Sequence, residues 1–242
     1  MIFEENLQYK HNPYQKENLP FEWRTILNWI GSNKNVLEVG CHTGDFSEQM
    51  KVHECMVTGM EINSKALELA KPFLKEAICG DIESKEAWEP LEGKKFDAIL
   101  YQHVLEHLSN PWRILSNSKK YLNNYGIVII ALPNISNAHS RFDMFFGQFN
   151  YEEMGVMDKT HLRFFNQKTA RELVTQAGMQ VDAYASSWRV NPVREFIDHL
   201  PLLNRLRFMF KENRASSLFS PNLTDVVMIF KCSQVNSHSR VI

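Results

Sequence analysis

Carboxylates stand beside glycines at three points where a short apolar run ends. The three pairs are Glu38 with Gly40, Gly59 with Glu61, and Gly80 with Asp81. Glycine at such a turn allows a positive φ and a close approach of the backbone to a ligand. A carboxylate there accepts hydrogen bonds from hydroxyl or amino groups. Turn chemistry alone also favours Gly and Asp, but three such turns in succession favour one ligand at the ends of neighbouring strands.

The first turn distinguishes between nucleotide ligands. In residues 36–45 (VLEVGCHTGD) an apolar run leads through Gly40, His42 and Gly44 into a helix that begins at Asp45. A dinucleotide fingerprint needs G-x-G-x-x-G, and a P-loop needs Gly-Lys-Ser/Thr. This segment has G-x-x-x-G and no such lysine, which disfavours an NAD-dependent oxidoreductase. Glu38 suits a cationic ligand, or one with hydroxyl and amino groups, better than a pyrophosphate.

The next two turns suit a nucleoside. Glu61 ends the second apolar run, where a carboxylate can accept from both ribose hydroxyls. Asp81 is placed to accept from an adenine amino group, with Ile82 against the ring. The three turns together therefore predict a site for one ligand with ribose hydroxyls and an adenine amino group.

Apolar periodicity predicts the elements that carry these turns. Strands are expected over 35–39, 55–60, 77–79, 96–101, 126–132, 179–187 and 224–231. Helices are expected over 18–30, 45–52, 64–74, 111–122 and 167–177. Short apolar strands that alternate with helices indicate a mostly parallel sheet covered on both faces, an α/β three-layer αβα sandwich.

A histidine-rich segment follows the strand expected at 96–101. His103-Val104-Leu105-Glu106-His107 formally matches H-x-x-E-H, the inverted zinc-peptidase pattern, which makes a zinc hydrolase a remote alternative. That enzyme needs the motif within a helix, whereas here it lies in a loop between a strand and Pro111. Loop scaffold, general base and metal ligand stay open as roles for Glu106 and His107.

Two segments interrupt the alternation of strands and helices. Residues 133–165 are rich in Phe and Tyr, and residues 189–214 combine a basic excess with an amphipathic helical pattern. Both follow strands, where α/β folds place ligand-contacting loops. We expect the first to form a substrate-binding lid. We expect the second to be a helical cap or a dimer contact, with weak contact to a membrane surface or a lipid-linked substrate as the alternative.

His161 and Arg163 lie two residues apart in the segment 158–165 (DKTHLRFF). Residues at that spacing face the same side of an extended segment, which suits a general base and a cationic clamp on one substrate. The alternative is structural, with His161 bonded to Asp158 and Arg163 paired with a carboxylate. Arg141 and Tyr151 are further substrate-binding candidates, although aromatic residues at such spacing are more often part of a core.

Taken together, the motifs resemble those of class I S-adenosylmethionine-dependent methyltransferases. The similar segments are LEVGCHTG (37–44), GMEIN (59–63), GDIES (80–84), FDAILYQHVLEHLSNP (96–111) and GIVIIALPN (126–134). DKTHLRFF is similar to a segment of small-molecule and surface-glycan O-methyltransferases. The resemblance covers about residues 30–187 and the terminal strand. It implies a Rossmann-like seven-stranded sheet whose antiparallel last strand lies between the fifth and sixth.

The resemblance implies S-adenosyl-L-methionine as the cofactor and a small-molecule acceptor. The expected acceptor is a hydroxyl of a sugar, a glycan precursor or a secondary metabolite, with N-methylation or a non-catalytic cofactor-binding relative as alternatives. His161 or His107 is the expected base. Cofactor binding is expected of Glu38, Gly40, His42, Gly44, Glu61, Ile62, Asp81, Ile82, Gln102 and His103.

Ubiquinone-pathway O-methyltransferases are similar at residues 103–107. Those enzymes have acidic and His residues there that can hold a divalent ion. This sequence has His103 where they have Glu, so no metal ligand is assigned.

Composition sets the remaining expectations. The 242 residues carry 27 Lys and Arg against 28 Asp and Glu, a balance that argues against nucleic-acid binding. No apolar run approaches the ~20 residues that span a bilayer, and the four cysteines form no CxxC pair, which is typical of reduced cytosolic thiols. We expect one cytoplasmic domain over 1–242, monomeric or homodimeric, without stable membrane insertion. Its additional segments are a helical segment at 1–31, the aromatic insertion at 133–165 and a basic helical insertion at 189–221.

Overall fold

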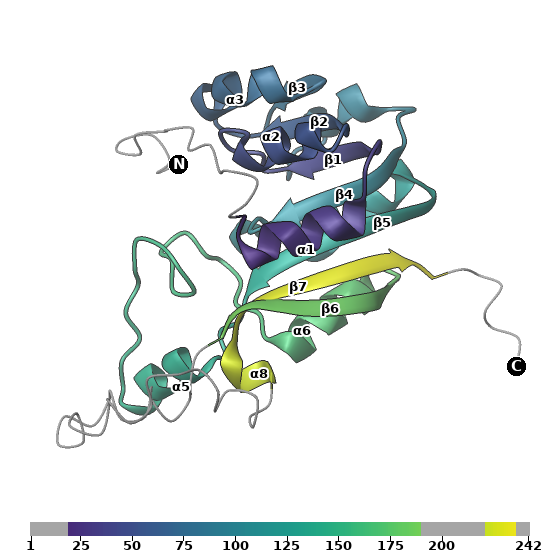
Figure 1. Ribbon diagram of the computed structural model, residues 1–242. Coiled ribbons are helices and arrows are strands. Elements are labelled where there is room, and N and C mark those ends of the chain that lie inside the picture. The colour runs from purple at the N-terminus through teal and green to yellow at the C-terminus, as the bar shows by residue number, and fades with distance from the viewer. Residues whose placement is uncertain (1–18, 190–220, 236–242) are drawn as a thin grey trace, which may run out of the picture.

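The structure, a computed structural model, describes residues 19–189 and 221–235. Within them, seven strands form one sheet in the order β3-β2-β1-β4-β5-β7-β6 (Figure 1). β7 is antiparallel to both β5 and β6, and the other neighbours are parallel. The strands are β1 (Asn35–Val39), β2 (Met56–Glu61), β3 (Glu76–Cys79), β4 (Phe96–Gln102), β5 (Leu122–Pro133), β6 (Met179–Arg189) and β7 (Asp225–Gln234). The expected Rossmann-like sheet, with its antiparallel last strand, is confirmed.

Helices cover both faces of this sheet. On one face, α1 (Phe21–Ile30) and α2 (Asp45–Val52) bury Ile26, Phe46 and Met50 in a cluster with residues of β1 and β4. On the other face, α4 (Pro111–Ser118) and α6 (Gln167–Gln176) bury Ile114 and Leu173 against the sheet. One apolar cluster lies on each face of the sheet, between the sheet and the helices. The fold therefore has the three layers that the sequence predicts. α3 (Ser64–Ala70) packs on β2 and β3.

Several elements differ from the expected ranges. The helix expected over 64–74 ends at Ala70 and continues as the 3-10 turn Lys71–Phe73, because Pro72 has no N–H for the next α-helical hydrogen bond. The helix expected over 111–122 likewise ends at Ser118. α5 (Ala138–Phe145) was not expected as a helix, although Asn137 caps it by accepting from the N–H of Ser140. α8 (Pro221–Thr224) is short. The basic segment expected over 189–214 lies outside the described residues from residue 190 onward.

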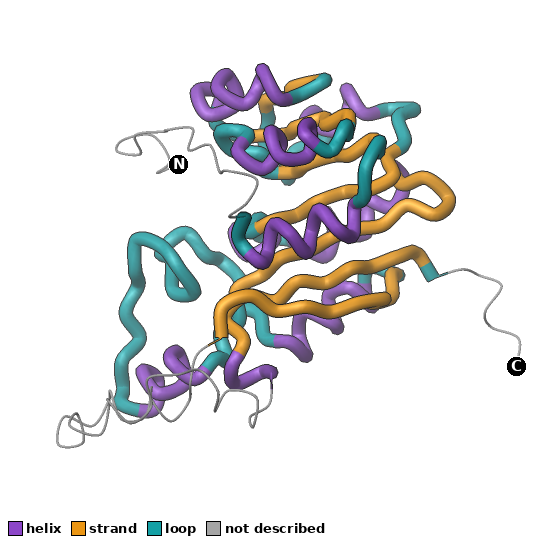
Figure 2. The backbone as a smooth tube through the Cα atoms, in the orientation of Figure 1, coloured by secondary structure: helices purple, strands orange, loops and turns teal. Residues whose placement is uncertain are grey.

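The loops that hold the candidate site leave the carboxyl ends of the parallel strands. The longest follows β5. It begins at Asn134 and returns at Phe165, where the two residues form a parallel bridge. Figures 1 and 2 show α5 and the irregular chain after it extending beyond the ends of the strands. Among the described residues, no helix is long and apolar enough to cross a membrane.

Candidate active site

Two glycines shape the turn after β1. Gly40 and Gly44 have φ angles of +74° and +82°. A Cβ on Gly40 would lie 2.6 Å from Cγ2 of Val104, and one on Gly44 would lie 2.8 Å from Cα of Ala70. Both positions therefore require glycine for backbone conformation and for space. The turn leads directly into α2 at the edge of the sheet.

Glu61, the last residue of β2, holds this turn in place. Its Oε2 accepts from the N–H of His42 at 3.0 Å, and its Oε1 accepts from the N–H of Asn63 at 2.9 Å. A carboxylate has about four lone-pair positions, so these bonds leave capacity for the hydroxyls of a ligand. His42, which the sequence places between the two glycines, has a φ of +48° and takes part through its backbone.

Glu38 lies in β1, two residues before Gly40. It is buried and accepts a hydrogen bond from the hydroxyl of Ser47 in α2. Burial raises the pKa of Glu38 to about 8; the bond from Ser47 opposes this, and the charges of Asp45 and Glu61 assist it. A nearby positive charge favours the ionised form of such a carboxyl group, so this position suits a cationic ligand.

The turn after β3 combines a polar and an apolar side chain. Oδ1 of Asp81 accepts from the N–H of Glu83 at 2.8 Å. Ile82 is buried, and its carbonyl accepts from Nε1 of Trp88 at 2.8 Å. Ile62, after β2, is 56% exposed and offers apolar surface.

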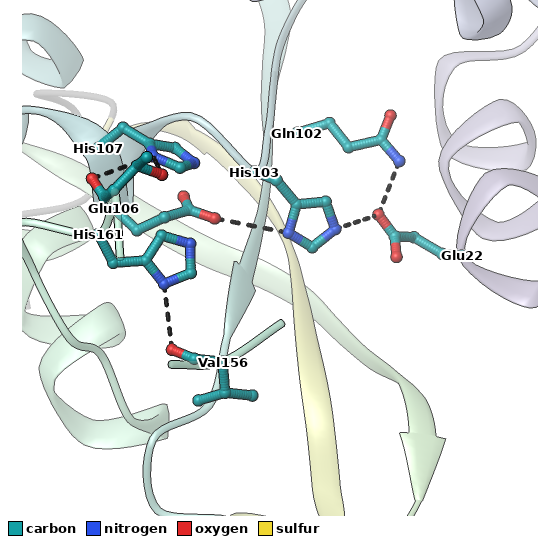
Figure 3. Close-up of polar contacts among 8 residues, drawn as sticks. Glu22, Gln102, His103, Glu106, His107, Val156 and His161 are labelled. Carbon is teal, nitrogen blue, oxygen red and sulfur yellow. Dashed lines mark hydrogen bonds and ion pairs between the residues drawn. The ribbon is translucent and has the colours of Figure 1, made fainter. Parts of the chain in front are cut away.

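A carboxylate on α1 reaches the loop after β4 (Figure 3). Oε1 of Glu22 accepts from Nε2 of Gln102 at 2.7 Å and lies 3.0 Å from Nε2 of His103. On its other side, Nδ1 of His103 lies 3.5 Å from Oε1 of Glu106. Burial alone would lower the pKa of His103, but Glu106 and Glu22 together raise it to about 10. Gln102 and His103 are thus oriented by α1.

None of the sequence motifs indicates Glu22. The periodicity of α1 does, because Glu22, Ile26 and Ile30 recur at a spacing of four on its buried face. A carboxylate within the apolar stripe of an amphipathic helix needs a polar partner elsewhere in the fold.

A second cluster lies close to His103. Glu106, His107 and His161 each present one potential ligand atom, and these atoms lie within 4.8 Å of one another. The three side chains line a cavity of about 300 Å³, which Glu22, Asp158 and Val156 also line. Glu106 is fully buried, and neither of its carboxylate oxygens has a hydrogen-bond partner within the described part of the chain. His103 forms an ion pair with Glu106, but the 3.5 Å between Nδ1 and Oε1 is too long for a good hydrogen bond.

The hydrogen bonds fix the tautomers of both imidazoles. Nδ1 of His161 lies 3.1 Å from the carbonyl oxygen of Val156, and Nδ1 of His107 lies 3.3 Å from the carbonyl oxygen of Thr160. A carbonyl oxygen only accepts, so each Nδ1 must carry a proton. In the neutral rings each Nε2 then has a free lone pair. Burial lowers the pKa of His161 although Glu106 opposes this, which favours the neutral ring.

Backbone hydrogen bonds bring the two histidine segments together. The N–H groups of Leu162 and Arg163 both donate to the carbonyl oxygen of Glu106 at 2.9 Å. The rings of His107 and His161 meet edge to face, with centroids 4.8 Å apart. His103 instead turns toward α1. The pairing of His103 with His107 on one helical face, which an inverted zinc peptidase needs, is not formed.

The other predicted substrate-binding residues lie apart from this cavity. Arg163 donates through Nη2 to the carbonyl oxygen of Ser109 at 2.6 Å, and Arg141 donates through Nε to that of Ser136 at 2.7 Å. Tyr151 is 60% exposed. None of the three lines the 300 Å³ cavity. The structure therefore brings His107 and His161 together in one cavity. Arg141 and Arg163 instead donate to carbonyl oxygens of loops outside it.

Comparisons with known proteins identify a methyltransferase domain in this chain. A family model described as a methyltransferase domain matches residues 14–184. A ubiquinone biosynthesis O-methyltransferase of Dechloromonas aromatica (strain RCB) is 32% identical over 117 residues, which are 45% of this chain and 50% of that protein. The chain thus spans about half the length of the curated relatives it matches.

Solved structures share the fold at low sequence identity. A SAM-dependent methyltransferase from Archaeoglobus fulgidus has a TM-score of 0.60 at 16% identity, covering 87% of this chain and 91% of that one. The magnesium protoporphyrin IX methyltransferase of Synechocystis PCC 6803 with bound SAH has a TM-score of 0.56 at 11% identity, covering 88% and 82%.

The fold and the acidic, glycine-bearing strand ends define a class I S-adenosylmethionine-dependent methyltransferase, as the motifs predict. Because the family model matches more than half of its length, this chain belongs to the methyltransferase domain family.

Proposed function

We propose that this protein transfers the methyl group of S-adenosylmethionine to a hydroxyl oxygen of a small molecule in the cavity beside His107 and His161. Family membership supports the methyl donor, and the names of the curated relatives supply the precedent of O-methylation. A sugar, a glycan precursor or a secondary metabolite is the acceptor class we favour. The acidic turns follow β1 and β2, and the cavity beside His107 and His161 is lined by the loop after β4, a parallel strand of the same sheet, which supports the proposal.

In the proposed cofactor site, Glu61 accepts from the ribose hydroxyls while it still binds the N–H groups of His42 and Asn63. Asp81 and Ile82 hold the adenine, and Glu38 lies near the positive end of the cofactor. The protein then has to align sulfur, methyl carbon and acceptor oxygen. Such positioning contributes about 7–11 kcal/mol to lowering a barrier.

The tautomers of His107 and His161 are the observation that supports a hydroxyl as the acceptor. Both imidazoles have Nδ1–H held by a carbonyl oxygen, so the Nε2 lone pairs are free in a shared cavity. An O–CH3 bond forms as the S–CH3 bond breaks, the sulfur keeps the electron pair to give S-adenosylhomocysteine, and the acceptor proton passes to Nε2 of His161. An amine acceptor with its own lone pair needs no such base.

The proposal is tested by incubating the full chain with S-adenosylmethionine labelled in its methyl group and a small-molecule extract. The expected product carries the label on an oxygen. A label on nitrogen would overturn the hydroxyl assignment. Cofactor binding without a labelled product across a broad set of acceptors would favour a non-catalytic relative.

A further inference from the structure

Glu83, in the turn after β3, binds the loop that leaves β4. Its Oε1 accepts from the hydroxyl of Ser109 at 2.7 Å and from the N–H of Asn110 at 2.9 Å, and its Oε2 accepts from the N–H of Ser109 at 3.0 Å. Nη2 of Arg113, in α4, donates to the carbonyl oxygen of Glu83 at 2.7 Å. Burial would raise the pKa of Glu83, but the hydrogen bonds to its carboxylate and the charge of Arg113 hold it below its ordinary value. The acceptor is therefore the ionised carboxylate, which forms the stronger hydrogen bonds.

Arg163 binds the same loop through two of its carbonyl oxygens. Its Nη2 donates to the carbonyl oxygen of Ser109 at 2.6 Å, and its backbone N–H donates to that of Glu106 at 2.9 Å. One residue of the insertion thus holds both ends of the segment that contains His107. Ser109 donates to a carboxylate and accepts from a guanidinium, and hydrogen bonds linked in this way strengthen one another.

The turn that carries Glu83 is also the turn predicted to bind adenine. Oδ1 of Asp81 accepts from the N–H of Glu83 at 2.8 Å, and the carbonyl oxygen of Asp81 accepts from the N–H of Ser84 at 2.9 Å. Ile82, between Asp81 and Glu83, is buried. A ligand that binds Asp81 and Ile82 therefore fixes the backbone from which the side chain of Glu83 extends.

These contacts reach the imidazole cavity, which His107 and His161 line, only through the backbone. Neither Glu83 nor Ser109 nor Arg163 is among the described residues that line it. A hydrogen-bonded connection nevertheless runs from the turn after β3, through Ser109, to the two segments that carry the histidines. A ligand shifts such a connection only if it binds the ordered state more tightly.

We propose that Glu83 and Arg163 are positioning residues, which hold the loop after β4 so that a nucleoside bound in the turn after β3 also orders the imidazole cavity. Arg163 then orients the cavity instead of clamping the substrate, the role that its spacing from His161 suggests. The enzyme would bind its cofactor first and complete the acceptor site as a result. Only this consequence for the acceptor rests on the proposed function.

The coupling is measured by hydrogen exchange of the full chain, followed by mass spectrometry of its peptides. S-adenosylhomocysteine should slow exchange in residues 37–44. It should also slow exchange about 5-fold or more, the lower end of usual coupling between sites, in residues 158–165, where two N–H groups donate to the carbonyl oxygen of Glu106. Adenosine has neither the sulfur nor the amino-acid part, and it should slow exchange in 158–165 as well, because the effect begins at the adenine.

Substitutions in the connection should remove this effect. In Glu83→Gln and in Arg163→Met, S-adenosylhomocysteine should still slow exchange in residues 37–44 but no longer in 158–165. Arg163→Lys keeps a donor for the carbonyl oxygen of Ser109 and should restore part of the effect. Ser109→Ala removes only the hydroxyl and should weaken the effect less than Glu83→Gln does. Because coupling is reciprocal, calorimetry should show an affinity for S-adenosylhomocysteine about 5-fold lower in Glu83→Gln.

Two exposed charges nearby provide matched controls. Glu86→Gln changes a carboxylate three residues after Glu83, and Lys168→Met changes a cation at the start of α6. Both variants should keep the full response to S-adenosylhomocysteine. Thermal unfolding of each variant separates lost coupling from lost folding, and Arg163→Met with Ser109→Ala decides the test where Glu83→Gln does not fold.

The inference is overturned if S-adenosylhomocysteine slows exchange in 37–44 of the unaltered chain but leaves 158–165 unchanged. It is equally overturned if Glu83→Gln and Arg163→Met respond like the unaltered chain. A response of 158–165 to S-adenosylhomocysteine but not to adenosine would also overturn it, because the ligand would then act on that segment directly.

Methyl transfer is recorded on the same variants and tests the proposed function separately. The exchange experiment contains no acceptor, so coupling without methyl transfer supports the positioning role and contradicts the function. Transfer to an oxygen without coupling leaves the function intact and removes the positioning role. With both in place, Arg163→Met should lower turnover roughly 10–100-fold, as expected when reacting groups are slightly misplaced.

Discussion

Glu22 and His103 are 81 residues apart in the chain, yet Oε1 of one lies 3.0 Å from Nε2 of the other. This contact ties α1, which packs on one face of the sheet, to the loop that leaves the carboxyl end of β4. The same Oε1 also accepts from Nε2 of Gln102. One side chain of α1 thus orients two consecutive residues that the motifs assign to the cofactor site.

Removal of this carboxylate should destabilise the fold. Glu22→Ala leaves Gln102 and His103 without their acceptor, and hydrogen bonds to a charged group contribute about 1.5–3 kcal/mol. We expect the lower end of that range, because the side chain of His103 is 39% exposed. Urea unfolding measures the loss. The matched control is Glu172→Ala, which breaks the exposed pair with Lys168 and should cost less than about 0.5 kcal/mol. Equal losses in the two variants would contradict the role of Glu22.

Gly44 should tolerate alanine less well than Gly93. Both glycines have positive φ, +82° and +74°, but a Cβ on Gly44 meets Ala70 at 2.8 Å, whereas one on Gly93 meets nothing within 4 Å. Gly93→Ala should cost about 1–2 kcal/mol for the left-handed backbone alone. Gly44→Ala should cost about 1–3 kcal/mol more for the steric overlap. Equal free energies of unfolding would show that space at the turn does not limit Gly44.

Glu61→Ala should weaken the binding of S-adenosylmethionine by roughly 10–100-fold, as expected for the loss of charged hydrogen bonds to ribose hydroxyls. Isothermal titration calorimetry measures this affinity. Glu68→Ala, which changes an exposed carboxylate on α3, is the control and should bind like the unaltered chain. An unchanged affinity in Glu61→Ala would remove Glu61 from the cofactor site.

The pKa of Glu38, about 8, predicts a pH dependence of cofactor binding. A cationic ligand favours the ionised carboxylate, so binding below pH 8 must release a proton. The affinity should therefore fall as the pH falls below 8 and level off above it. Glu38→Gln should bind S-adenosylmethionine more weakly and with a flatter profile. Identical pH profiles would show that Glu38 does not sense the charge of the cofactor.

The raised pKa of Glu38 also predicts how the stability of the fold depends on pH. Its folded pKa lies above the unfolded value of about 4.3, so the folded state holds the extra proton between these values. Stability should consequently fall as the pH rises from about 4 to about 8. The unfolding free energy of the unaltered chain should decline more over this window than that of Glu38→Gln. A parallel decline in both would contradict the raised pKa.

The sheet and the glycine-bearing turns at its strand ends could be predicted from the sequence because their signals are local. Apolar runs that end in Gly and an acidic residue indicate a strand and its turn without reference to any other part of the chain. Gly40, Gly44 and Glu61 belong to this group. The predicted strand ends differ from the observed ones by a few residues.

The imidazole cavity could be predicted only in part. The sequence indicates His107 and His161 as candidates, but their proximity depends on two N–H groups that donate to the carbonyl oxygen of Glu106, and no local pattern encodes this. The same backbone contacts explain why Arg163 lies outside the cavity. The segment that directs His161 inward lets the Arg163 guanidinium donate to the carbonyl oxygen of Ser109 instead. The apolar stripe around Glu22 indicates that its carboxylate needs a polar partner, but the partners, Gln102 and His103, are 80 and 81 residues away and no local pattern indicates them.

His161→Ala should lower the turnover of methyl transfer roughly 10²–10⁴-fold, the usual contribution of a positioned base. Cofactor affinity should be unchanged, because the proposed mechanism places His161 beside the acceptor. His139→Ala is the matched histidine control and should leave turnover intact. Normal turnover of His161→Ala with the identified acceptor would exclude His161 from the mechanism.

The arrangement of cofactor and acceptor is tested most directly by a crystal structure of the full chain with S-adenosylhomocysteine. We expect the ribose hydroxyls on the carboxylate of Glu61, the adenine against Ile82, and the sulfur facing the cavity that His107 and His161 line. A nucleoside bound elsewhere, or a sulfur separated from that cavity by protein, would contradict the account.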